Sequence, residues 1–350
     1  MKIMVYECPK KLRIDEINDM PINSSQIRIR TLFSGISHGT EMNIYRGVAP
    51  FFKKKLDSDL NLFINKGNND EWTYPIRSCD PGVWYMGYSN VGEVIEIGRN
   101  ISNIKVGDIV YSEAPHQSQV IKKENEVIKL PEGIKPEYGV FFTNLLTSFN
   151  IILDSKIKLG DVAVVSGLGV LGQLSLQMVK LSGAFKVFGV DLFEKRLKVA
   201  LENGAYKVYN PKTVQDIAYD IRKETNKKGA DISIEVSGNQ KALNEVIRIA
   251  APDTTVIAAG WYQGKCSDLN LSEEFHHNRI IIRCSQTGEI NPEIRHVWNF
   301  ERKITFCLEL LKKLRFDNLI TNKIPFEDAP EAYKLIDKKP EDIIQILLKY

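Results

Sequence analysis

The chain has 350 residues, 43% of them hydrophobic, which is long enough for two separate hydrophobic cores. With 47 basic and 44 acidic residues the formal net charge is only +3, so the composition gives no reason to expect a nucleic-acid partner. No run of about 18 apolar residues occurs and the N-terminal segment becomes polar too early for a secretory signal, so we expect a cytoplasmic protein with no membrane partner.

The first part of the chain, up to about residue 130, predicts β-structure. Segments such as 26–33 and 91–97 alternate apolar and polar residues and are separated by Gly, Asn and Asp. Between 48 and 84 this periodicity stops, although the segment is rich in aromatic residues: Phe51, Phe52, Phe63, Trp72, Tyr74 and Trp84. The sequence leaves two interpretations open, a functional loop or a flap that its aromatic side chains hold against the body.

From residue 145 the pattern changes to strands that alternate with helices. Segment 161–167 contains a continuous apolar run typical of a central parallel strand, and the apolar residues of 170–181 then recur at helical spacing. The alternation continues to about residue 287, which predicts a doubly wound parallel sheet.

A G-x-G-x-x-G motif lies between the first strand and the first helix of this series, at Gly167, Gly169 and Gly172. The first glycine permits a tight turn, the second lets the backbone approach a pyrophosphate, and the third lets helix and strand pack closely. Free N–H groups at the start of the helix then bind the anion. We therefore expect a dinucleotide site that also includes the intervening residues Leu168, Val170 and Leu171.

The next strand ends on Asp191, where an acid is expected to bind the ribose hydroxyls. Because a 2′-phosphate would meet this carboxylate, NAD(H) is favoured over NADP(H). Lys195 and Arg196 follow closely, and they are either exposed cations of the next helix or part of the cofactor site, in which we include Arg196. We also assign to this site three residues that follow the later strands: Ser237, Gly238 and Gly260.

The whole chain resembles the medium-chain dehydrogenase/reductase superfamily of alcohol-dehydrogenase-like proteins. The segments GISHGTEMNIYRG, GYSNVGEVIEIG, FHHNRIIIRCSQTG and IPFEDAPEAYKL resemble the subgroup around bacteriochlorophyllide (hydroxyethyl) dehydrogenase. The resemblance implies an α/β protein, with a chaperonin-10-like barrel at 1–144 and 288–350, a Rossmann domain at 145–287, and an active site between them. It also implies a homodimer formed through the last Rossmann strand, near 279–287.

Zinc-dependent members of this superfamily carry a cysteine where this chain has Ser37. Tyr88 and Ser89 stand where the family has His and Glu, and the third ligand position falls near Thr143 or Asn144. Zinc prefers thiolate, imidazole and carboxylate ligands, so the resemblance implies that no catalytic zinc is bound. The five cysteines also lack the close spacings of structural zinc or disulfide frameworks, and we expect them to be reduced.

Without zinc, the protein itself must stabilise or protonate the substrate oxygen during hydride transfer. Ser37 and Tyr88 are candidate hydrogen-bond donors, and His38 or His116 is a candidate acid. Structural alternatives stay open: Tyr88 could fill the space that a metal leaves, and Glu41 could tie the loop to a backbone N–H. His38, Glu41 and His116 could also regroup around a metal.

We therefore expect an enzyme that interconverts a secondary alcohol and a ketone with NAD(H) and without zinc. The substrate is expected to be a small molecule, sugar-like or phosphorylated, and the aromatic side chains of 48–84 could stack on it. Two alternatives remain: a zinc-free NAD(P)H-dependent reductase of enones or quinones, and a dinucleotide-binding protein without catalysis.

Overall fold

The computed structural model describes residues 1–66, 73–226 and 228–350, which fall into two compact units. Unit 1 comprises Met1–Thr143, Asn322–Pro340 and Ile346–Tyr350, and unit 2 comprises Asn144–Thr321 and Glu341–Gln345. The C-terminal return to unit 1 thus begins at 322 rather than at 288. Of the expected aromatic residues in 48–84, Trp72 lies outside the described residues.

Unit 1 is built on a sheet in which β3 is central and pairs antiparallel with β7, β9 and β18. Ile27 and Ile29 are fully buried, whereas the intervening Arg28 pairs with Glu96 at 2.7 Å, so the alternation of the sequence gives the strand one apolar and one polar face. In sheet order, its strands are β10 Val127–Lys129, β8 Ile109–Ser112, β7 Asn90–Ile97, β3 Gln26–Gly35, β18 Gln345–Lys349 and β17 Ile320–Pro325. A seventh strand, β9 Gln119–Lys123, lies outside this order and pairs with β3.

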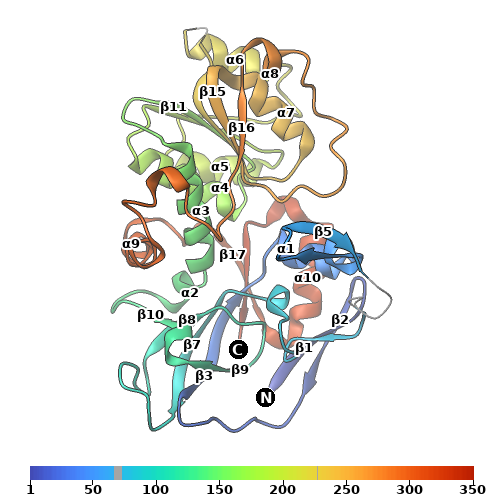
Figure 1. The fold of residues 1–350 in the computed structure, drawn as a ribbon, viewed down its shortest axis with the longest axis vertical. Coiled ribbons are helices and arrows are strands. Elements are labelled where there is room, and N and C mark those ends of the chain that lie inside the picture. Colours follow the sequence, from blue (N-terminus) through green and yellow to red (C-terminus); the bar gives the residue numbers. More distant parts are fainter. Residues whose placement is uncertain (67–72, 227) are drawn as a thin grey trace. The chain divides into compact units, whose positions relative to one another are not determined.

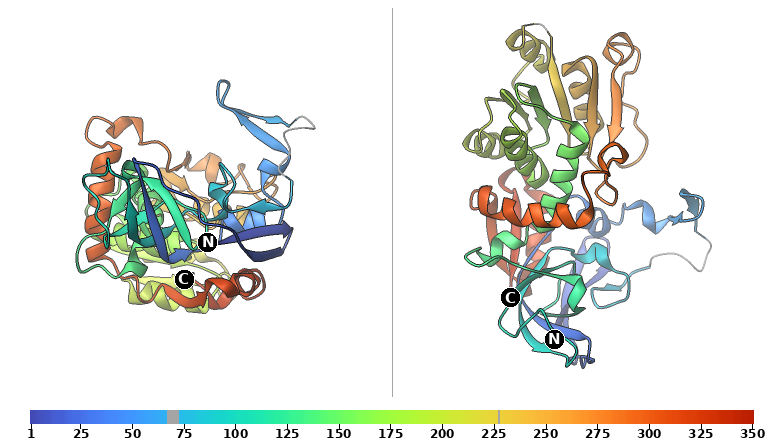
Figure 2. Two further views of the ribbon diagram at one scale, coloured as in Figure 1. Left: turned by 90° about the horizontal axis from the view of Figure 1, so that it is seen from below. Right: turned by 60° about the vertical axis from the view of Figure 1, so that its left-hand side comes forward.

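Smaller elements complete unit 1. A second sheet has the order β2-β1-β6, and a two-stranded hairpin, β4–β5, projects from the rest of the unit (Figure 2). The strands are β1 Lys2–Cys8, β2 Lys11–Glu16, β6 Ile76–Arg77, β4 Lys54–Asp57 and β5 Leu62–Asn65. The helices and 3-10 turns are α1 Thr40–Tyr45, η1 Pro50–Phe52, η2 Trp84–Met86, η3 Glu124–Glu126, α2 Pro136–Gly139, η5 Phe326–Asp328 and α10 Ala329–Lys338; η6 Pro340–Asp342 begins in unit 1 and ends in unit 2.

Unit 2 contains a parallel sheet with the strand order β13-β12-β11-β14-β15-β16. The chain runs outward from β11 to β13 and then returns to β14 on the other side of β11, so the order reverses between β11 and β14. In such sheets ligands bind beyond the carboxyl ends of the strands at this reversal point. The strands are β11 Val162–Ser166, β12 Lys186–Val190, β13 Lys207–Tyr209, β14 Ala230–Glu235, β15 Ala250–Ala258 and β16 Ile281–Cys284.

Helices pack on the parallel sheet and bury its apolar residues (Figures 1 and 2). The helices and 3-10 turns of unit 2 are α3 Phe142–Ser155, α4 Val170–Leu181, α5 Glu194–Glu202, α6 Ile217–Glu224, α7 Gln240–Ile249, α8 Glu274–His277, η4 Pro292–Ile294 and α9 Phe300–Lys313. The expected α/β class, with a Rossmann-like parallel sheet and a second, β-rich unit, is therefore confirmed.

Aromatic packing explains why residues 288–321 belong to unit 2. The ring of Phe149, on α3, lies 4.9 Å from the rings of both Trp298 and Phe306, measured between centroids. The buried Lys303 ammonium also donates to the side chain of Asn150, another residue of α3, at 3.1 Å. These contacts hold α9 against α3, which no local feature of the sequence predicts.

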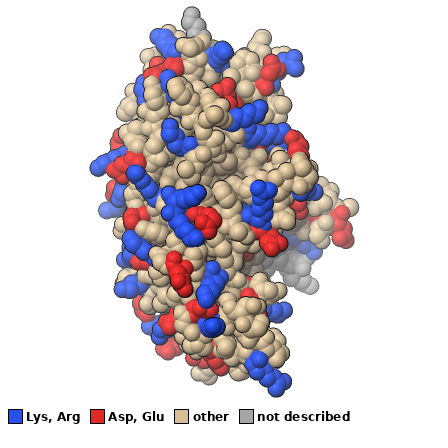
Figure 3. Space-filling view, turned by 90° about the vertical axis from the view of Figure 1, so that its left-hand side faces the viewer, with Lys and Arg blue, Asp and Glu red and all other residues tan. Residues whose placement is uncertain are grey.

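No described helix has both the length and the apolar character needed to cross a membrane. On the face shown in Figure 3, basic and acidic side chains are interspersed, without a large patch of one sign.

Candidate functional site

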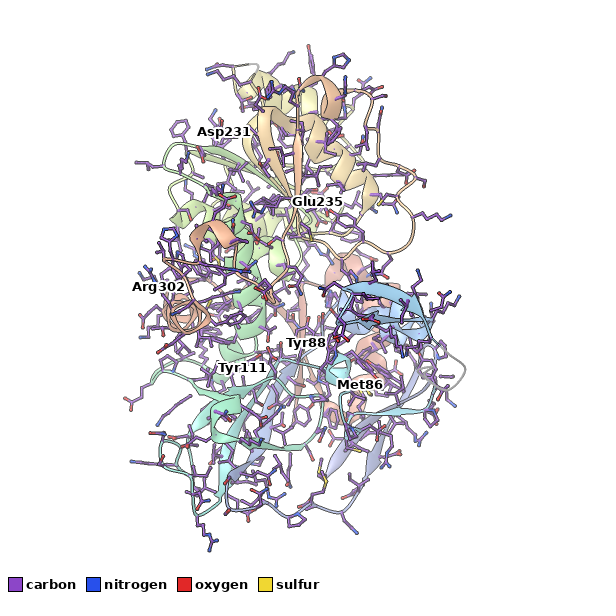
Figure 4. The ribbon with its side chains drawn as sticks, viewed as in Figure 1. Met86, Tyr88, Tyr111, Asp231, Glu235 and Arg302 are labelled. Atoms are coloured by element: carbon purple, nitrogen blue, oxygen red, sulfur yellow. The ribbon has the colours of Figure 1, made fainter. Side chains whose placement is uncertain are left out.

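Ser37 and Tyr88 lie side by side in unit 1, where the Tyr88 hydroxyl donates a hydrogen bond to Ser37 Oγ at 2.6 Å. The register of the sheet brings them together across 51 residues of chain. Ser34 near the end of β3 pairs with Asn90 at the start of β7, so the residues just beyond these two positions emerge at the same edge. Figure 4 labels Tyr88 at this edge.

Thr143 joins the same group. Its hydroxyl donates to the backbone carbonyl of Tyr88 at 3.2 Å and hydrogen-bonds to the Tyr111 hydroxyl. The Tyr111 hydroxyl, which Figure 4 also labels, lies 3.1 Å from the same Tyr88 carbonyl oxygen, so its one proton goes either to that carbonyl or to Thr143. Hydrogen bonds therefore link Ser37, Tyr88 and Thr143, which the resemblance places at or near the zinc-ligand positions of related enzymes.

The side chains of these positions do not fit a zinc ion. They offer neutral hydroxyl groups, whereas zinc takes thiolate, imidazole or carboxylate ligands in tetrahedral array. Within residues 1–66, 73–226 and 228–350, no three His, Cys, Asp or Glu side chains come together as a metal site. Desolvation raises the pKa of Tyr88 to about 12, so this hydroxyl is protonated near neutral pH and can donate a hydrogen bond.

Glu41 and His116 are fully buried behind Ser37 and pair with each other, with His116 Nε2 at 2.8 Å from Glu41 Oε2. The other carboxylate oxygen accepts the backbone N–H of Ser37 at 2.8 Å. Glu41 thus ties the loop, which is one of the two roles that the sequence allowed. His38 is half-buried on the same turn. Glu41 and His116 are therefore inaccessible to solvent in this structure.

Further residues of this buried network have no signal in the sequence. The Tyr333 hydroxyl donates to Glu41 at 2.6 Å across 292 residues, and Tyr6 donates to Tyr333 at 3.1 Å. On the other side, Ser34 Oγ lies 2.7 Å from His116 Nδ1 and 2.9 Å from the Tyr350 hydroxyl. A buried carboxylate needs such partners, because leaving a buried polar group unsatisfied costs about 1–3 kcal/mol.

In unit 2, the glycine motif has the geometry of a pyrophosphate cradle. Gly167 has φ +88°, and a Cβ on Gly172 would lie 1.8 Å from the Gly167 carbonyl oxygen, so both positions require glycine. A Cβ on Gly169 would meet nothing within 4 Å, which leaves open space at the start of α4. Val170 and Leu171 form the first turn of that helix. The residues present therefore fit a dinucleotide.

Asp191 is fixed at the end of β12. Its carboxylate accepts the backbone N–H of Leu168 at 2.7 Å and that of Phe193 at 3.0 Å. The Arg196 guanidinium lies 3.8 Å from it, donates to the Ile343 carbonyl at 3.0 and 3.2 Å, and is only 14% exposed. Arg196 is therefore not an exposed cation, the alternative that the sequence left open for it.

Glu235 is a residue of this site that the sequence analysis missed. It ends β14, next to β11, and is fully buried. Its carboxylate accepts the backbone N–H of Ser237 at 2.7 Å and that of Gly238 at 3.2 Å, and it also accepts the hydroxyls of Ser237 and Tyr262. Burial raises the pKa of Glu235. An acid at the carboxyl end of a mostly apolar strand was the available signal.

Glu235 brings together the three later residues that were assigned to the cofactor site. A Cβ on Gly260 would lie 2.2 Å from the Gly238 nitrogen and 2.9 Å from the Glu235 carboxylate. A Cβ on Gly167 would lie 2.7 Å from that of Ser237. The loops after β11, β14 and β15 therefore meet at the carboxyl edge of the sheet, around one buried carboxylate.

Comparison with known proteins is consistent with this geometry. Residues 170–301 match the family model described as zinc-binding dehydrogenase. D-guloside 3-dehydrogenase of Escherichia coli K12 is 30% identical over 353 residues, covering 99% of each chain. Among solved structures, 2R,3R-butanediol dehydrogenase from Bacillus subtilis aligns with a TM-score of 0.78 at 22% identity, covering 100% of this chain and 99% of that one. An alcohol dehydrogenase from E. coli CFT073, in complex with NADH, aligns with a TM-score of 0.76 at 18% identity, with coverage of 100% and 99%.

We expect Gly169→Ala to keep the fold and weaken NADH binding about tenfold or more, since the methyl group would occupy the open space at the helix start. Gly172→Ala is the matched contrast. Its methyl group collides with the Gly167 carbonyl, so the free energy of unfolding should fall by about 1–3 kcal/mol, in addition to the loss of NADH affinity. NADH fluorescence titration and thermal unfolding measure both effects. Unchanged NADH affinity in Gly169→Ala would contradict the assigned cradle.

The raised pKa of Glu235 gives a pH dependence of stability. A carboxyl whose folded pKa exceeds its unfolded value contributes stability that is full below the ordinary value of 4.5 and is lost as pH rises through the folded pKa. The unfolding free energy of the parent minus that of Glu235→Gln should therefore decrease from pH 4 upward. Urea unfolding across this range tests it, with Glu309→Gln, an exposed carboxylate of α9, as control. A difference that is independent of pH would count against this assignment.

Proposed function

Because the chain belongs to the medium-chain dehydrogenase/reductase superfamily and is an alcohol dehydrogenase-like oxidoreductase, we propose that it interconverts a secondary alcohol and a ketone with NAD(H), using its own hydroxyl groups in place of zinc. The hydrogen bond from Tyr88 to Ser37 carries this proposal, since it joins hydroxyls at two positions where related enzymes hold the metal. The relative named for a guloside supports a sugar-like substrate.

The preference for NAD(H) rests on Asp191. Two backbone N–H groups hold its carboxylate in place beside the glycine motif, and a 2′-phosphate brought there would meet a fixed negative charge. Arg196 is engaged by the Ile343 carbonyl and so is less suited to neutralise that phosphate. When bound, the nicotinamide ring accepts or donates the hydride.

Ser37 is the residue that we assign to the substrate oxygen. Its Oγ accepts hydrogen bonds from the Tyr88 hydroxyl at 2.6 Å and from the Thr40 N–H at 3.3 Å, which directs its own proton elsewhere. In the reducing direction Ser37 gives this proton to the developing alkoxide, Tyr88 replaces it, and Tyr88 then takes a proton from water. Oxidation runs through the same groups in reverse order.

Glu41 keeps this donor in place. By accepting the Ser37 N–H it fixes the turn from which the hydroxyl projects, and His116 and Tyr333 hold the carboxylate in turn. Preorganised donors of this kind contribute about 10²–10³-fold to rate, because they need no rearrangement as charge develops.

Purified protein should oxidise one or more polyols, hexoses or glycosides with NAD⁺ faster than with NADP⁺, and the rate should survive prolonged treatment with a zinc chelator. Absorbance of the reduced cofactor reports the rate, and elemental analysis reports bound metal. Chelator-sensitive activity that only zinc restores would overturn the zinc-free mechanism. NADH binding without turnover on alcohols, ketones or enones would instead favour a non-catalytic role, and turnover of enones alone would favour a reductase of conjugated double bonds.

Ser37→Ala should lower kcat by about 10²–10³-fold with NADH affinity unchanged, because it removes the donor to the substrate oxygen but leaves the cofactor loops intact. Tyr88→Phe should lower kcat less, since Ser37 remains. Steady-state kinetics and NADH titration separate the two effects. Tyr219→Phe, an exposed hydroxyl on α6, serves as the matched control. Near-normal turnover in Ser37→Ala is the result that this mechanism does not allow.

A further inference from the structure

An aromatic cluster in unit 1 is not used by the mechanism above. The Phe51 ring lies 5.9 Å from the Phe63 ring and 6.4 Å from the Trp84 ring, measured between centroids. Trp84 is 51% and Phe63 48% exposed, and both contact Phe51, so they form a contiguous patch rather than isolated exposed side chains. Phe63 lies on the projecting β4–β5 hairpin and Trp84 on η2, so two separate elements contribute to one exposed apolar surface.

The surface is held rigidly at its Trp84 end. Tyr85 and Met86, the next residues of η2, are buried, and η2 packs against α1. The Trp84 ring contacts that of Tyr85 at 5.8 Å with an interplanar angle of 80°. The Met86 carbonyl accepts the N–H of His116 at 3.0 Å. The exposed indole is therefore presented by a fixed backbone rather than by a loose loop.

The same backbone continues directly to the candidate donor pair. Tyr88 follows η2 after only Gly87, whose φ is +118° and whose Cβ would lie 2.9 Å from the His116 nitrogen. On the other side of η2, α1 begins shortly after Ser37. Trp84 therefore lies on an element that leads directly to Tyr88 and packs against α1, the helix that follows Ser37. This connects the aromatic surface to the proposed substrate site of unit 1.

The Phe51 end is anchored as well. Phe52 stacks on Tyr74 at 5.3 Å between ring centroids, and the Tyr74 hydroxyl donates to the Ile44 carbonyl of α1 at 2.7 Å. The segment before the hairpin is therefore fastened to the helix that follows Ser37. The rings of Phe63 and Trp84 are thus half exposed, whereas Phe51, Phe52 and Tyr74 are partly buried and Tyr85 and Met86 are buried.

We propose that Trp84 and Phe63, supported by Phe51, form a second subsite that binds a sugar ring attached to the ring being oxidised, so that the substrate is a glycoside of two sugar units. The proposal rests on the function proposed above. A pyranose has an apolar face of C–H groups and a polar rim of hydroxyls, which suits it to stacking on an exposed aromatic ring with the rim in water.

The test compares a free hexose, its methyl glycoside and its disaccharide, for the hexose that gives the highest rate with NAD⁺. We expect kcat/KM to be highest for the disaccharide. Trp84→Ala should lower kcat/KM for the disaccharide about five- to tenfold, the size of an aromatic stacking contact, and change that for the free hexose less than about twofold. Trp84→Phe should keep most of the parent value of kcat/KM for the disaccharide. Leu60, in the turn of the hairpin, is 65% exposed, and Leu60→Ala should have no effect.

Equal losses on all three substrates, or no loss on any, would overturn the subsite. Sedimentation velocity of Trp84→Ala tests whether a second copy of the chain, rather than a sugar, occupies this surface. A change in the number of subunits would show that it does and would overturn the subsite. Thermal unfolding of each variant shows whether it is folded. Saturation-transfer NMR measures contact of the disaccharide with the parent protein and with Trp84→Phe, and so gives a readout that does not depend on turnover. Activity on free hexoses without a preference for the disaccharide refutes only the subsite, whereas no turnover with any alcohol refutes the proposed function itself.

Discussion

The buried carboxylate of Glu41 is the constraint on which the candidate active site depends. A buried carboxyl group without solvent needs hydrogen-bond partners, and here they come from the Ser37 backbone, His116 and Tyr333. These contacts fix the turn that carries Ser37, and with it the position at which Tyr88 can donate. The chemistry proposed for the hydroxyl pair is possible because two oxygens are held 2.6 Å apart before a substrate arrives.

Unit 2 uses the same principle with different partners. Glu235 is also fully buried, and it accepts from the backbone N–H of Ser237 and from the Tyr262 hydroxyl; burial raises its pKa. It joins the loops that follow β14 and β15, as Glu41 joins the segments around Ser37. Each unit thus organises its loops at one edge of a sheet around an internal carboxylate. The cradle at Gly167 differs, because steric exclusion rather than charge sets its form.

Local sequence patterns predicted the elements but not their long-range partners. The parallel sheet and the glycine motif could be recognised because strand periodicity, helix periodicity and the motif's spacing are all short-range signals. The packing of α9 on α3 depends on ring contacts of Phe149 with distant residues, and so the start of the C-terminal return was placed too early. Likewise Tyr333 reaches Glu41 across 292 residues, without any motif to mark it. Similarity to alcohol and polyol dehydrogenases confirms the superfamily, while membership of the bacteriochlorophyllide subgroup and a homodimeric state stay predictions.

The position of the β4–β5 hairpin in the chain affects which mutations the candidate site can tolerate. The hairpin is inserted in the connection between β3 and β7, yet the pairing of those two strands does not involve it. Mutations that lengthen or shorten the hairpin, or that change its exposed side chains, should therefore leave the β3–β7 register intact. This register brings the Ser37 and Tyr88 hydroxyls together. A change to the hairpin surface can therefore alter what unit 1 binds while the hydrogen bond between Tyr88 and Ser37 stays in place.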